Sequence, residues 1–66
     1  MQTYKVVGQI KSRNAQCHVF YHQKDNLSKQ EKEANYQRAK DKIRAQFIAE
    51  GFSLNPTFRR YFVRAV

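Results

Sequence analysis

The chain has few of the residues that cross-link a small fold or bend its backbone. Its 66 residues include one cysteine, one proline, two glycines and no tryptophan. Because a lone thiol cannot form an internal disulfide, Cys17 excludes the disulfide-stapled architecture common among small secreted domains. Gly8 and Gly51 stand far apart, which excludes a glycine-rich phosphate-binding loop.

Long apolar runs are also missing. No stretch approaches the roughly 20 apolar residues that a membrane-spanning helix needs. Residues 1–5 lead directly into an alternating pattern and contain no signal-peptide apolar region. We therefore expect a soluble, cytoplasmic protein that does not bind membranes.

Acidic residues are scarce. Five Asp and Glu oppose thirteen Lys and Arg, which gives a net charge of +8. A surface this basic repels copies of itself and attracts polyanions such as nucleic acid, an anionic membrane or the acidic face of a protein. Charge therefore indicates the class of partner without identifying the partner.

The composition is nevertheless that of a folded protein. Hydrophobic residues make up 41% of the chain and include four Tyr and five Phe, too many for a disordered tail. We predict one domain over residues 1–66, near the lower size limit for a chain that folds alone. Formation of a homodimer would be a natural way to bury more surface.

Two strands are predicted at the start of the chain. Polar and apolar residues alternate over Thr3–Lys11 and again from Ala15, with Cys17 on one face of the second strand and His18, Phe20 and His22 on the other. Residues 12–14 are typical of a tight turn, and Asn tolerates a left-handed backbone. The two strands should pair as an antiparallel hairpin.

A long helix is predicted to follow, up to Glu50. Ser28 and Glu31 have the spacing of a capping box, and Gly51 is placed to end the helix with Phe52 folded back onto its last turn. Residues 29–35 carry little apolar surface and should reach into solvent. The predicted apolar stripe consists of Tyr36, Ala39, Ile43 and Phe47, widened by Ile48.

The segment 57–66 is β-branched, aromatic and basic, which predicts a third strand. A right-handed crossover through the helix places this strand beside the first. We therefore expect an α+β fold, a small ββαβ domain with a three-stranded antiparallel sheet in the order 2-1-3 and one long helix packed on one face. The other face must meet solvent, a second subunit or a ligand.

The last strand is the most suggestive segment for binding. With Tyr61 turned towards the helix, Phe58, Arg60, Phe62 and Arg64 would face outward; in the reverse orientation Phe58 and Phe62 are core and the arginines lie at the sheet edge. Single-stranded nucleic acid needs cations for its phosphates and flat rings for its bases. The predicted binding residues are Lys5, Lys11, Arg13, Phe20, Phe58, Arg59, Arg60, Phe62 and Arg64.

Neither metal binding nor catalysis is supported by the spacing of the reactive residues. On a strand His18 and His22 would lie roughly 13 Å apart, and Cys17 would point to the other face. The same alternation separates Cys17 from His18, which prevents a nucleophile–base pair. We therefore expect no metal, no cofactor and no enzyme activity.

Two functions remain in view. The first is a non-enzymatic nucleic-acid-binding module, with RNA slightly favoured, although the chain lacks both the aromatic signature of an RNA-recognition motif and a KH-type GxxG loop. The alternative is a small basic adaptor or inhibitor that binds an acidic protein through the open sheet face or a strand edge. A membrane-bound helix ranks third because carboxylates dilute its basic residues.

Overall fold

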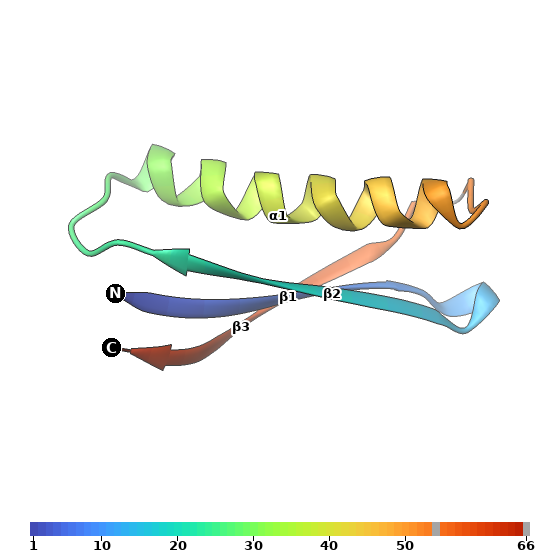
Figure 1. The fold of residues 1–66 in the computed structure, drawn as a ribbon, viewed down its shortest axis with the longest axis horizontal. Coiled ribbons are helices and arrows are strands. Elements are labelled where there is room, and N and C mark those ends of the chain that lie inside the picture. The colour runs from blue at the N-terminus through green and yellow to red at the C-terminus, as the bar shows by residue number, and fades with distance from the viewer. Residues whose placement is uncertain (54, 66) are drawn as a thin grey trace.

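The computed structural model describes residues 1–53 and 55–65, with side chains described up to Val63. Strands β1 (Gln2–Ile10), β2 (Ala15–Gln23) and β3 (Thr57–Ala65) form one sheet in the order β2-β1-β3. Both outer strands pair antiparallel with β1, and α1 (Lys29–Ala49) runs along one face of the sheet (Figure 1). The predicted fold class and strand order are confirmed, while Val66 lies outside the described residues.

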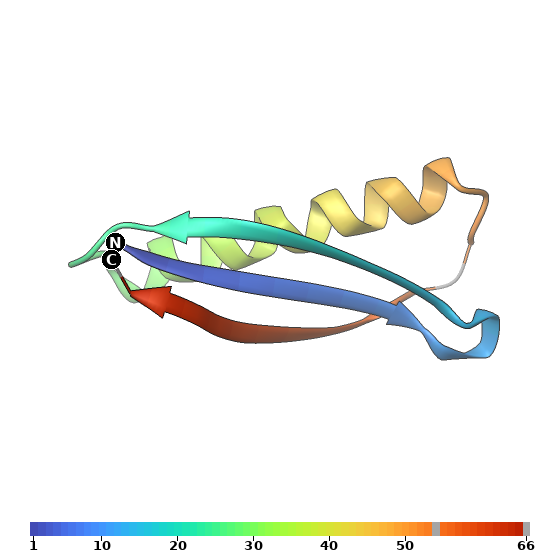
Figure 2. The ribbon, with the colours of Figure 1, turned by 60° about the horizontal axis from the view of Figure 1, so that its bottom comes forward.

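A short turn joins β1 to β2. It consists of one turn of 3₁₀ helix (Lys11–Arg13) followed by Asn14 in the left-handed conformation, with φ 52° and ψ 38°. The Asn14 amide donates a hydrogen bond of 3.1 Å to the carbonyl of Lys11. The predicted tight hairpin is confirmed, and its tip lies at the end of the sheet remote from both chain termini (Figure 2).

Both ends of α1 are capped as the sequence predicts. The Ser28 hydroxyl accepts a hydrogen bond of 3.2 Å from the amide of Glu31 and donates one of 3.0 Å to the Glu31 carboxylate. At the other end Gly51 takes a positive φ of 93°, which lets the amide of Phe52 bond to the carbonyl of Phe47 at 3.0 Å. The Phe52 ring then packs edge-on against the Phe47 ring.

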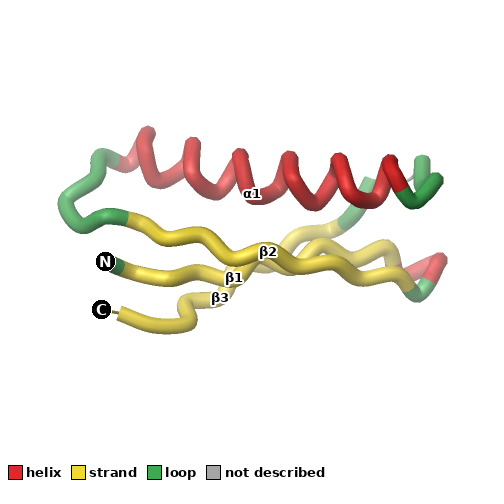
Figure 3. Tube along the Cα trace, in the orientation of Figure 1, coloured by secondary structure: helices red, strands yellow, loops and turns green. Residues whose placement is uncertain are grey.

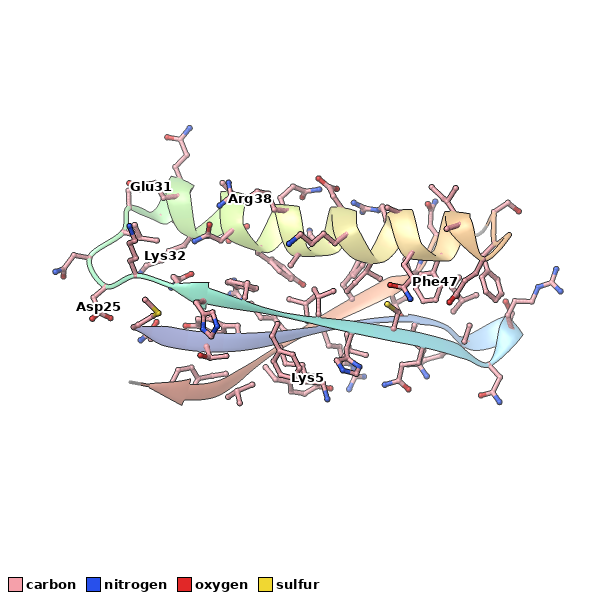
Figure 4. The ribbon with its side chains drawn as sticks, in the orientation of Figure 1. Lys5, Asp25, Glu31, Lys32, Arg38 and Phe47 are labelled. Carbon is pink, nitrogen blue, oxygen red and sulfur yellow. The ribbon has the colours of Figure 1, made fainter. Side chains whose placement is uncertain are left out.

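Figure 3 shows α1 and the sheet as two layers, and the hydrophobic core lies between them. Its buried hydrophobic residues are Val6, Ile10, Ala39, Ile43 and Phe47. Figure 4 shows Phe47 on the side of α1 that faces the sheet. The helix packs mainly on β1 and β2, so β3 is an edge strand with less cover.

The predicted apolar stripe of α1 is narrower than expected. Ala39, Ile43 and Phe47 are buried, but Ile48 is 70% exposed, so the prediction that Ile48 widens the stripe was wrong. Successive helical residues are turned by 100°, which carries Ile48 out of the narrow contact with β1 and β2. Residues 29–34 are exposed, as predicted.

Candidate nucleic-acid interface

The sheet face turned away from α1 is uncovered and carries ordered cross-strand rows. Val6 and Gly8 are buried beneath the helix, so the alternate residues of β1 project from the other face. Figure 4 shows Lys5 on this side. We call this surface the open face; its described members are Thr3, Lys5, Val7, Gln9, Gln16, His18, Phe20, His22, Thr57, Arg59 and Tyr61.

The central row of the open face places a cation between two aromatic rings. Lys5 is paired in register with Phe20 on β2 and with Tyr61 on β3. Phe20 is 54% exposed and Tyr61 is 46% exposed, so both residues are accessible from solvent. The His18 ring lies edge-on to Phe20, with 5.6 Å between centroids.

A broad depression of ≈ 580 Å³ lies beside this row, towards the hairpin turn. Three cations line it: Lys5, Lys11 and Arg59. Among the side chains that the structure describes, in residues 1–53 and 55–63, the ion pairs shown are those of the N-terminal amine with Asp25 and of Arg44 with Asp41. The three cations of the depression therefore have no carboxylate partner among the described side chains.

Strand β3 is not oriented with Tyr61 towards the helix, which was the first of the two arrangements given above. Phe58, Arg60 and Phe62 oppose Gly8, Val6 and Tyr4 of β1, so they project towards the helix side and the prediction that they face outward was wrong. Phe58 fills the space above Gly8, where β1 has no side chain. The reverse orientation is the one found, although Phe62 remains 57% exposed rather than core.

On the helix side, the guanidinium group of Arg60 packs against aromatic rings. The guanidinium carbon lies 4.7 Å from the centre of the Tyr36 ring and 5.6 Å from that of Tyr4. The Tyr21 hydroxyl is buried without a hydrogen bond of good geometry, and its interaction with Arg60 is the main reason that the pKa of this guanidinium is raised. Arg60 is therefore an exposed, charged side chain that lies against tyrosine rings.

Two helix cations extend this arrangement along the line where α1 faces β3. The Lys40 ammonium group lies 4.5 Å from the Tyr36 ring centre and 5.9 Å from that of Phe58. The Arg44 guanidinium carbon lies 5.0 Å from the Phe58 ring centre. We call this surface the α1–β3 seam; its members are Tyr4, Tyr36, Lys40, Arg44, Phe58, Arg60 and Phe62.

Sequence reasoning missed Tyr61 on the open face and the helix residues of the seam. The signal for the seam was the i, i+4, i+8 spacing of Tyr36, Lys40 and Arg44, which places them along one flank of a helix. The signal for Tyr61 was its parity with Arg59 on the strand.

The structure brings Lys5, Phe20 and Arg59 together on the open face, with Lys11 lining the depression beside them, while Phe58, Arg60 and Phe62 lie on the helix side. Arg13 lines a small hollow of ≈ 160 Å³ near the end of α1, beside Glu50. Arg64 is paired with Thr3 in the sheet, and its side chain lies outside the described residues.

Cys17 is part of the core layer. It packs beside the buried cluster on the face opposite His18, as predicted, and burial together with the Glu50 carboxylate raises the pKa of its thiol. Among residues 1–53 and 55–65 no group of three His, Cys, Asp or Glu side chains could hold a metal ion. Nor does that part of the chain contain a helix with the length and apolar character needed to cross a bilayer.

The open face thus combines accessible rings, polar amides and cations that have no carboxylate partner among the described side chains. Such a surface can stack flat groups and pair with anions at the same time. No protein-family model, characterised protein or solved structure matches this chain.

Proposed function

We propose that this protein is a non-enzymatic module that binds single-stranded nucleic acid, with RNA as the favoured ligand, on its open face. The row formed by Phe20, Lys5 and Tyr61 carries the proposal. Neighbouring strands lie about 4.8 Å apart, so the two rings flank the lysine at a separation of roughly 10 Å. Two bases of an extended strand can stack on these rings while the phosphate between them meets Lys5.

The charge distribution supports a polyanion as the ligand. Lys5, Lys11 and Arg59 converge on one depression and have no carboxylate partners among the described side chains. Each phosphate that they neutralise releases condensed counterions, so affinity depends steeply on salt. Rings beside these cations favour exposed bases over a duplex, whose bases are already stacked.

The experiment is a binding titration with labelled single-stranded RNA, single-stranded DNA and duplexes. Binding is measured by fluorescence anisotropy at several salt concentrations. The test variant is the double substitution of Phe20→Leu and Tyr61→Leu, which keeps apolar side chains on the strands. Loss of stacking should weaken binding by about 1–3 kcal/mol per base. The control is Ile48→Leu, an exposed apolar residue on the helix.

Three results would overturn the proposal. The first is the absence of binding to any of these nucleic acids, and the second is an affinity that does not change with salt. The third is a double variant that binds single strands as tightly as the unmodified protein.

The alternative proposal is an adaptor that docks on an acidic protein. It is favoured by the two edge strands β2 and β3, each nine residues long, which can accept a partner strand. A pull-down repeated after nuclease treatment separates the proposals, because a protein partner that survives the nuclease supports the adaptor. Light scattering with and without an oligonucleotide tests a homodimer through the open face, which would hide Phe20 and Tyr61.

A further inference from the structure

Strand β3 carries basic and aromatic residues on both of its sides. Arg59 and Tyr61 belong to the open face, whereas Arg60 and Phe62 alternate with them and belong to the α1–β3 seam. Because α1 packs mainly on β1 and β2, both Arg60 and Phe62 remain exposed. The edge of β3 is therefore bordered by a cation and a ring on each side.

The cations of the seam are held in place before any ligand arrives. Arg60 lies against the rings of Tyr4 and Tyr36, and Lys40 lies between Tyr36 and Phe58. A guanidinium group stacked through its flat face keeps in-plane N–H groups available for bidentate bonds to a phosphate. Restricting these long side chains in advance lowers the entropy cost of binding.

The described side chains of the α1–β3 seam also carry a net positive charge. Its cations are Lys40, Arg44 and Arg60, and among the described side chains Asp41 forms an ion pair with Arg44 at 3.2 Å. Glu33 acts on Arg60 only through its longer-range field. Lys40 and Arg60 thus have aromatic neighbours, and among the described side chains neither forms an ion pair with a carboxylate.

We propose that the α1–β3 seam is a second phosphate-binding strip, and that a nucleic acid strand bound on the open face continues around the β3 edge onto Arg60 and Lys40. This inference rests on the proposed function of the open face. It extends the binding site from one side of the sheet to two. The competing explanation is that the cation–ring contacts serve only to hold α1 against β3.

A length series of oligouridylates tests this strip. A strand of about 4 nucleotides fits one face, whereas one of about 16 nucleotides can span both faces. The test variant is the double substitution of Arg60→Gln and Lys40→Gln. It should bind the long strand about tenfold more weakly than the unmodified protein, with a shallower salt dependence, and bind the short strand unchanged.

The matched control is the double substitution of Arg38→Gln and Lys42→Gln. Like the test variant it removes two positive charges, but both belong to the side of α1 that borders β2, so the long strand should still bind to it almost normally. Urea unfolding is measured for every variant. If Arg60→Gln unfolds the protein, the single variants Lys40→Gln and Arg60→Lys carry the test.

The outcomes separate this inference from the proposed function. If Lys5→Gln weakens binding of both strand lengths but the seam variant binds the long strand normally, only the seam proposal fails. A seam variant that is less stable to urea yet binds normally shows a purely structural role and also overturns it. If neither strand binds the unmodified protein, the proposed function itself fails.

Discussion

Ile43 of α1 lies directly over Gly8 of β1, so close that a Cβ atom at Gly8 would overlap the Ile43 side chain. The same atom would crowd Phe58 at 3.3 Å and Phe47 at 3.4 Å. We expect Gly8→Ala to destabilise the protein by about 1–3 kcal/mol, because the Ile43 side chain must move away from β1 and the rings of Phe58 and Phe47 must shift to make room.

Urea unfolding followed by circular dichroism measures the effect of Gly8→Ala. The neighbouring variant Gln9→Ala, on the open face, should change stability by less than about 0.5 kcal/mol. The steric argument would be wrong if Gly8→Ala unfolded at the same urea concentration as the unmodified protein.

Two isoleucines of α1 offer the same substitution in opposite environments. Ile43 is fully buried, whereas Ile48 is 70% exposed. Ile43→Val should cost about 0.5–1.5 kcal/mol, because it removes a methylene group from the centre of the core. Ile48→Val should have almost no effect in the same denaturation experiment, and equal losses at the two positions would contradict the observed core.

The N-terminal cap of α1 depends on one hydroxyl group. Ser28 accepts the amide hydrogen of Glu31, and residues 29–34 in the first turns of the helix are exposed. Ser28→Ala should cost about 0.5–2 kcal/mol, and Ser28→Asp should retain most of the stability. Thermal unfolding measures both variants, with Ser53→Ala as the control; a harmless Ser28→Ala would show that this cap contributes little.

The elements and their order could be predicted from local patterns. Alternation defined the first two strands, Asn14 defined their turn, and Ser28 with Gly51 marked the two ends of the helix. Each of these signals acts within a few residues, so it survives in the folded structure. The strand order followed because the handedness of crossovers leaves few arrangements open.

The orientation of β3 could not be predicted from local patterns. Arg60 lies on the same face of the strand as Phe58 and Phe62. If this face points towards the helix, a charged group is placed among apolar rings; if it points outward, the two rings are exposed to solvent. The choice depends on Gly8, which leaves room for Phe58, and on Tyr36 of a distant helix, which receives Arg60. Contacts between segments remote in sequence carry no periodic signal.

The end of β3 contains a further irregularity that no pattern indicated. Tyr4 is paired with Phe62 but Thr3 is paired with Arg64, so Val63 is an extra residue in the ladder. Such a bulge reverses the strand's parity beyond it. Predictions from alternation therefore held best for β1 and β2 and failed on β3.

The thiol of Cys17 makes stability depend on pH. Burial and the Glu50 carboxylate raise the pKa of this thiol in the folded state, so the folded protein retains its proton while the unfolded chain loses it. Stability should therefore fall as the pH rises above about 8.5, the ordinary pKa of a cysteine. Urea unfolding from pH 7 upwards measures the fall, and Cys17→Ala should show a smaller one; parallel profiles for the two proteins would contradict this cause.

Charge and stacking on the open face can be separated by their response to salt. Arg59→Gln would remove one of the proposed phosphate contacts, so it should weaken binding of single-stranded RNA and reduce the slope of log K against log salt by about 0.7. Phe20→Leu removes a stacking surface and no charge, so it should lower affinity at every salt concentration and leave the slope unchanged. Anisotropy titrations at four or more salt concentrations give both quantities. An unchanged slope for Arg59→Gln would show that Arg59 does not contact a phosphate. An unchanged affinity for Phe20→Leu would show that no base stacks on Phe20.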